Sequence, residues 1–215
     1  METMQFVNFL ARWGHLLFGM TWMGLLYYFN FIQGGYFKAA TPEALKDAKA
    51  KLAPEALWWF RWSAMFTFIT GLILLVGLAK QDLLNAYIIA GITLGTLMFL
   101  NVWLIIWPNQ KIALGLVEGG DGPTAAGKAL LASRTNTLFS GPMAFFMLAG
   151  PHFVSGGGYG LKAEGSTGLL VALAIIAALE VNAIVGKQGP MTTVKGVIHC
   201  SLALTAVLVA LLVYV

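Results

Sequence analysis

Long apolar runs separated by short polar stretches extend along the whole chain, and this pattern predicts an all-α integral membrane protein. A transmembrane helix needs about 20 mostly apolar residues. Six segments fit that length: about 6–32, 57–79, 83–107, 135–154, 167–186 and 195–215. We expect them to form a single transmembrane domain over residues 1–215. The fourth segment is the weakest, because Pro142, Gly150 and Pro151 lie within it.

The polar stretches at 33–56, 108–134 and 155–166 are expected to connect these helices. In the first, Thr41 before Pro42 predicts a short capped helix. In the second, "EGGDGP" predicts a flexible turn, followed by a short helical run, "TAAGKALLASR". The third, "SGGGYGLKAEGS", has no core-forming pattern and is expected to be a loop.

The composition agrees with a lipid environment. The chain is 59% hydrophobic and 10% charged, with a mean hydropathy of +0.79, whereas soluble domains carry about 25% charged residues. The small net charge of +4 lies between the apolar runs, so we expect the lipid bilayer, and not nucleic acid, as a partner. A single cysteine excludes an internal disulfide, and three dispersed histidines do not form a zinc or copper cluster.

The basic residues predict an orientation. Those near the first, third and fifth connections are Lys38, Lys46, Lys49, Lys51, Arg61, Lys111, Lys128, Arg134, Lys187 and Lys195, and those on the opposite side are Arg12, Lys80 and Lys162. Positive charge stays in the cytoplasm. We therefore expect a bacterial inner-membrane protein with both termini on the periplasmic side.

His15 is an ionisable residue inside the first apolar run, where such residues are costly and often functional. Ala11 and Gly19 lie one turn away on each side and share its helix face. These small residues would leave a flat bay for a porphyrin, with His15 as the axial ligand of haem iron, Arg12 beside a propionate and Trp22 as a wall. The alternative is a histidine hydrogen-bonded between closely packed helices.

Other polar residues fall within or beside the apolar runs. His152, at the outer end of the fourth segment, is either an interfacial residue or a second iron ligand. Glu180, Asn101 and His199 are candidates for a proton-transfer or substrate site near the inner side. The alternative for all three is structural hydrogen bonding or ion pairing between helices.

The first helix, "RWGHLLFGMTWMGLLYYFNFIQ", resembles the opening helix of the urate oxidase N-terminal family, the membrane part of a bacterial cytochrome-c-linked urate oxidase. The resemblance continues through "PEALWWFRWSAMFTFITGL" (54–72), "MFLNVWLIIWPNQK" (98–111) and "SRTNTLFSGPMAFFM" (133–147), whereas the last two helices agree only in hydropathy. The shorter element from His15 to Gly24 is also similar to membrane-bound, haem-b-containing protoporphyrinogen oxidases.

The family resemblance implies a b-type membrane cytochrome with His15 as a haem ligand, acting in electron transfer as a urate-oxidase-like oxidoreductase. Full-length members carry a C-terminal cytochrome c domain, and this sequence ends at Val215. We therefore expect a separate cytochrome c or another membrane subunit as electron acceptor. Two alternatives stay open: a non-redox accessory subunit of a larger membrane complex, and a protoporphyrinogen-oxidase-like enzyme.

Overall fold

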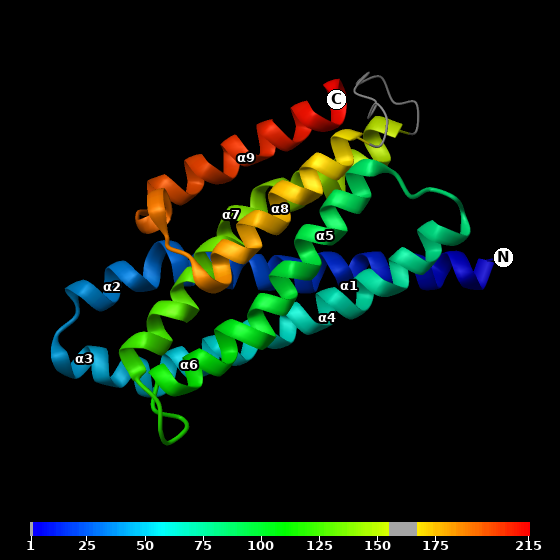
Figure 1. Ribbon diagram of the computed structural model, residues 1–215. Coiled ribbons are helices and arrows are strands. Elements are labelled where there is room, and N and C mark those ends of the chain that lie inside the picture. Colours follow the sequence, from blue (N-terminus) through cyan, green and yellow to red (C-terminus); the bar gives the residue numbers. More distant parts are fainter. Residues whose placement is uncertain (1, 155–166) are drawn as a thin grey trace. The chain divides into compact units, whose positions relative to one another are not determined.

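A computed structural model describes residues 2–154 and 167–215, and the regular elements of these two stretches are all helices (Figure 1). This agrees with the predicted all-α class. The expected loop at 155–166, with Lys162, lies outside the described residues.

The chain divides into two compact units, one of Met1–Asp82 with Phe99–Ser133 and the other of Leu83–Met98 with Arg134–Val215. Each unit is described by itself below.

A long antiparallel helical hairpin dominates the first unit. Its first arm runs without a break through α1 (Glu2–Tyr27), the π-helical turn η1 (Tyr28–Gln33) and α2 (Gly34–Ala39). Its second arm runs through α3 (Pro42–Asp47), the π-helical turn η2 (Ala48–Leu52) and α4 (Ala53–Lys80). The arms pack along their length between α1 and α4.

The turn of this hairpin is only two residues long, Ala40 and Thr41, both with extended backbone. Thr41 caps α3 as expected, because its hydroxyl accepts a hydrogen bond from Ala44 N at 3.3 Å. The expected connection over 33–56 contains this turn, but most of its residues are helical. The helix continues past the capped turn, because "EALKDAKAKLAPEA" holds mostly helix-favouring residues and its Pro54 lies in the first turn of α4.

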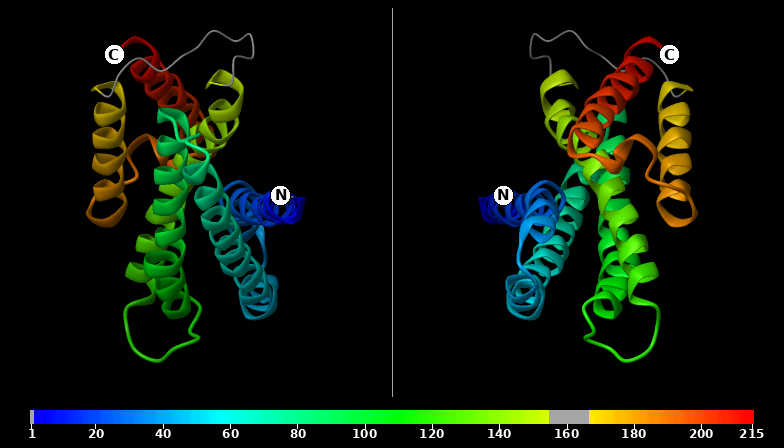
Figure 2. Two further views of the ribbon diagram at one scale, coloured as in Figure 1. Left: turned by 90° about the vertical axis from the view of Figure 1, so that its right-hand side faces the viewer. Right: turned by 90° about the vertical axis from the view of Figure 1, so that its left-hand side faces the viewer.

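The rest of the first unit holds the end of α5 (Ala86–Leu100), the π-helical turn η3 (Asn101–Ile106), α6 (Trp107–Ala113) and the start of α7 (Gly122–Val154). The loop between α6 and α7, drawn in green in Figure 2, contains Gly119 and Gly120 with positive φ angles of 84° and 92°. These angles agree with the flexible turn predicted at "EGGDGP". The helical run after it is not separate, because it continues directly into the fourth predicted span.

The second unit contains most of α5, α7 from Arg134 onward, α8 (Thr167–Val185), the short 3₁₀ turn η4 (Gly189–Thr192) and α9 (Val194–Tyr214). Gly91 of α5 lets α7 approach closely, since a Cβ there would lie 3.3 Å from Met147 N. Pro142 and Pro151 do not interrupt α7. Polar neighbours and close helix packing tolerate such prolines in membrane helices.

Among the described residues, the helices long and apolar enough to cross a membrane are these four: Pro42–Lys80, Ala86–Ala113, Thr167–Val185 and Val194–Tyr214. They contain or coincide with the second, third, fifth and sixth predicted spans to within a few residues. The first and fourth predicted spans fall on α1 and α7, which are long but carry more polar residues. The chain therefore has the helices of a membrane protein, and six crossings remain a prediction.

Candidate functional site

The His15 imidazole is held against α4 by two hydrogen bonds from one ring nitrogen. Nδ1 lies 2.9 Å from the Thr67 carbonyl oxygen and 3.2 Å from Thr70 Oγ1. A carbonyl accepts only, so Nδ1 carries the proton and donates to it. The neutral ring then keeps a lone pair on Nε2. Histidines that ligate metals have this same arrangement: one ring nitrogen binds the metal, and the N–H of the other donates a hydrogen bond, often to a backbone carbonyl.

Two features of α4 make this contact possible. The Thr70 hydroxyl donates to the Phe66 carbonyl oxygen at 2.7 Å, so its lone pairs face outward to accept from His15. Gly71 provides space for the ring, because a Cβ at this position would lie 3.1 Å from His15 Cε1 and 3.5 Å from Nδ1. The imidazole therefore lies in a notch of α4 at Gly71, where an added Cβ would force the ring to shift.

The neighbours of His15 on α1 divide into two groups. Ala11 and Trp22 are buried, and a Cβ on Gly19 would lie 3.9 Å from Thr67 Cγ2. A side-chain methyl at Gly19 would therefore be in ordinary van der Waals contact with α4. Arg12 is exposed one turn from His15. Within the described chain the buried Trp22 Nε1 has no hydrogen-bond partner.

These residues fit haem in part. His15 can offer Nε2 to a metal, because its other ring nitrogen, Nδ1, is already hydrogen-bonded to α4. Arg12 is exposed one helical turn from His15, where it could pair with a carboxylate. Ala11 is buried and Gly19 is half-buried, and a porphyrin bay beside them stays a prediction.

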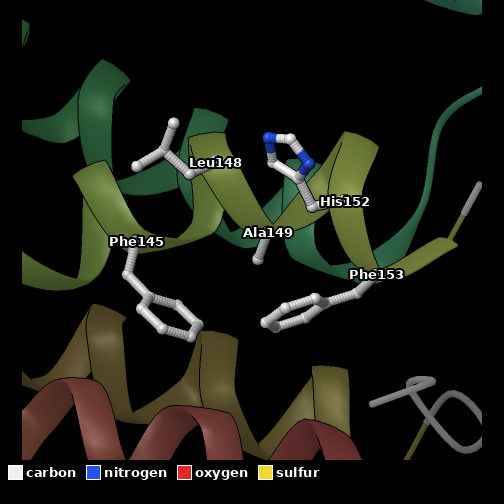
Figure 3. A pocket seen from close by; sticks show the side chains of 5 residues that line it. All are labelled: Phe145, Leu148, Ala149, His152 and Phe153. Atoms are coloured by element: carbon white, nitrogen blue, oxygen red, sulfur yellow. The ribbon is translucent and has the colours of Figure 1, made fainter. Parts of the chain in front are cut away.

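His152 lies in the second unit, on α7. It is exposed and lines a shallow depression of about 210 Å³ with Phe145, Leu148, Ala149 and Phe153. Figure 3 shows Leu148 and His152 on one side of the helix and Phe145 and Phe153 on the other. This volume is below the roughly 300–1,000 Å³ typical of ligand pockets, so the depression alone does not enclose a porphyrin.

The three inner-side candidates have different environments. Asn101 is buried at the first position of η3, in the first unit. Glu180 on α8 is half-buried and His199 on α9 is exposed, both in the second unit. No cluster of three or more His, Cys, Asp or Glu side chains able to hold a metal ion occurs among the residues described.

Thr67, Thr70 and Gly71 were not predicted as site residues. Their spacing of three and four residues places them on one face of α4, and this face was readable in "TFITG". The sequence alone did not reveal that this face meets His15, 52 to 56 residues earlier.

The described part of the chain thus has helices suited to a membrane and a histidine of α1 that is anchored to α4. The chain belongs to the urate oxidase N-terminal family, which matches residues 81–213. This confirms the family suggested by the sequence. The match includes the last two helices and contains Asn101, His152, Glu180 and His199, whereas His15 and its partners precede it. No curated protein and no solved structure matches the chain.

Proposed function

We propose that this protein is a b-type cytochrome of the bacterial inner membrane that takes part in electron transfer and oxidation. The observation that carries the proposal is the hydrogen bond from His15 Nδ1 to the Thr67 carbonyl oxygen. It fixes the ring and its tautomer and leaves Nε2 as the ligating atom. Haem b, when bound, supplies a one-electron redox centre.

The chain's own residues have distinct roles in this proposal. His15 ligates the iron, and Thr67, Thr70 and Gly71 hold its ring in one orientation. Arg12 neutralises a propionate, and Trp22 supports the α1–α4 contact beside the ligand. His152 as a second ligand stays a prediction from the sequence. Glu180, Asn101 and His199 are proposed to serve a proton or substrate.

Family membership supports an oxidase of urate-oxidase type, with urate as the first substrate to test. In the first unit, Lys46, Lys49 and Lys51 lie near the turn of the hairpin and Lys80 lies at its far end. This separation supports a cytoplasmic hairpin turn and a periplasmic N-terminus. Electrons would then leave to a separate cytochrome c or another membrane subunit on the periplasmic side.

The decisive experiment is an absorption spectrum of the full chain, purified in detergent, before and after reduction with dithionite. We expect a b-type signal in the wild type and its loss in His15→Ala. His199→Ala is the matched control, because it removes an exposed histidine on another helix and should leave the signal unchanged. His152→Ala tests the second ligand and should convert the spectrum to a five-coordinate form.

Circular dichroism and size-exclusion elution show whether each variant keeps its fold. A wild type without any b-type signal, or an undiminished signal in folded His15→Ala, rejects the proposal. Haem-free protein that migrates with a large membrane assembly would instead favour the accessory-subunit alternative. Accumulation of porphyrins on deletion of the gene would favour the protoporphyrinogen-oxidase alternative.

A further inference from the structure

A groove of about 440 Å³ lies in the first unit, between the start of the second hairpin arm and the end of α6. Pro42, Leu45, Lys46, Lys49, Ala50 and Leu114 line it. Four of these side chains are apolar and two are cationic. The groove therefore suits a ligand that is anionic at one end and apolar at the other.

The two groove lysines are available for such a ligand. Lys46 and Lys49 are exposed and three residues apart, so they project from one face of the helix. The ion pair in the described part of the chain joins Lys51 and Asp47 at 2.5 Å. Neither Lys46 nor Lys49 has a carboxylate within ion-pair distance among the described residues.

Aromatic and basic residues continue from the groove toward the apolar part of the hairpin. Lys111 lies one turn before Leu114, and its Nζ is 5.6 Å from the centre of the Trp107 ring. The guanidinium of Arg61, a residue of α4, lies 3.8 Å from the centre of the same ring. Trp58 and Trp59 are exposed nearby on α4. Tryptophan side chains concentrate at the boundary between hydrocarbon and headgroups.

The distance along the helix places the lysines close to the headgroups. Nine residues separate Lys49 from Trp58, which is about 13 Å of helix. The headgroup layer on each side of a bilayer is roughly 5–8 Å thick. The long lysine side chains can extend back toward lipid phosphates across the remaining distance.

We propose that this groove binds the phosphate headgroup of an anionic phospholipid in the cytoplasmic leaflet. Lys46 and Lys49 bind the phosphate, and Leu45, Ala50 and Leu114 line the groove beside it. Basic pockets on the cytoplasmic side of helical membrane proteins bind such headgroups. This site is separate from His15 and does not depend on haem.

The test compares delipidated full-length protein with two double variants. Lys46→Gln/Lys49→Gln removes the groove charges, and the control Lys38→Gln/Lys128→Gln removes the same charge from exposed positions outside the groove. Glutamine keeps the helical preference of lysine. The ligands are short-chain phosphatidylglycerol, short-chain phosphatidylcholine, inorganic phosphate and glycerol 3-phosphate, with binding measured by calorimetry.

We expect wild type and control to bind phosphatidylglycerol well above phosphatidylcholine. The groove variant should bind it about thirtyfold more weakly, since each lysine near an anionic lipid contributes roughly fivefold. Added salt should weaken the wild-type interaction. Equal binding of the two lipids, or equal loss in both folded variants, overturns the proposal. Inorganic phosphate or glycerol 3-phosphate binding as tightly as the lipid would also overturn it and assign the groove to a soluble phosphate.

Discussion

The His15 ring is positioned by residues of the neighbouring helix α4 and not by residues of its own helix, α1. The Thr67 carbonyl, the Thr70 hydroxyl and the missing side chain of Gly71 all belong to α4. A ligand fixed in this way can keep one orientation while its other nitrogen binds a metal. The same contacts also lock α1 to α4, so a change in the notch should affect both stability and any ligand at Nε2.

Gly71→Ala tests the notch directly. Its new Cβ would lie 3.1 Å from His15 Cε1, so the ring must shift by a few tenths of an ångström. Overpacking of this kind costs about 1–3 kcal/mol, against a gain of about 0.5–1 kcal/mol from replacing a helical glycine. We expect a lower midpoint of thermal unfolding in detergent and an altered spectrum of any bound haem.

Gly14→Ala is the matched control on the α1 side of the contact between α1 and α4. Its Cβ would lie 3.6 Å from Thr70 Cγ2, an ordinary van der Waals distance. It should leave the spectrum unchanged and keep or raise the unfolding midpoint. Identical behaviour of the two variants would show that the notch does not constrain the His15 ring.

The sequence predicted the importance of His15 from its cost in an apolar run, but not the partners that hold it. Such partners depend on the register between two helices, which hydropathy does not specify. Ala11 and Gly19 illustrate this limit. Small residues allow close approach by another group, and the structure places Thr67 of α4 3.9 Å from a Cβ on Gly19.

At the scale of elements, asparagines accompany two of the π-helical turns. A π turn shifts backbone hydrogen bonds to an i→i+5 pattern, which disturbs the pairing of nearby carbonyls. Asn30 Nδ2, within η1, donates to Leu26 O at 2.9 Å. Near η3, Asn136 Nδ2 donates to Met98 O at 2.9 Å from another helix, α7.

Asn136→Ala should destabilise the second unit. Asn136 and Met98 are both completely buried, so the substitution removes a buried hydrogen bond between two helices. Such a hydrogen bond contributes about 0.5–1.5 kcal/mol, and truncating a buried side chain adds the cost of a cavity. We expect the unfolding midpoint to fall clearly.

Asn109→Ala is a suitable comparison, because its half-buried side chain donates to Ile105 O within one helix, at 2.8 Å. It should lower the unfolding midpoint less than Asn136→Ala, since water can replace its hydrogen bond more easily. An equal or smaller effect of Asn136→Ala would exclude a special role for the bond between α7 and α5.

Hydropathy predicted where the apolar helices lie better than where they end. Apolar runs identify the part of a helix that lipid or protein covers, whereas a polar continuation has no such signature. The segment before Leu57 is helical back to Pro42, and the run before Thr135 is helical back to Gly122. The π turns at Tyr28–Gln33 and Asn101–Ile106 were not predicted, because the sequence holds no breaker there.

At the scale of the molecule, the length of the second hairpin arm decides whether its ends reach water. Thirty-one residues separate Lys49 from Lys80, which is about 46 Å of helix. This exceeds the roughly 30 Å hydrocarbon core and matches a bilayer with its headgroups, about 40–45 Å. If this arm crosses the membrane, Lys49 and Lys80 lie at opposite surfaces of the bilayer. The positive-inside rule then assigns Lys49 to the cytoplasmic surface.

Cysteine labelling in bacterial spheroplasts checks this orientation. Cys200 is first replaced by serine, which leaves a chain without cysteine, and Lys49→Cys or Lys80→Cys is then introduced at an exposed position. We expect a membrane-impermeant maleimide to label Lys80→Cys in intact spheroplasts and Lys49→Cys only after permeabilisation. Labelling of both in permeabilised membranes is the control for reactivity. The reverse pattern would place the hairpin turn, and with it the groove lysines Lys46 and Lys49, on the periplasmic side. Labelling of both variants in intact spheroplasts would show that this arm does not cross the membrane.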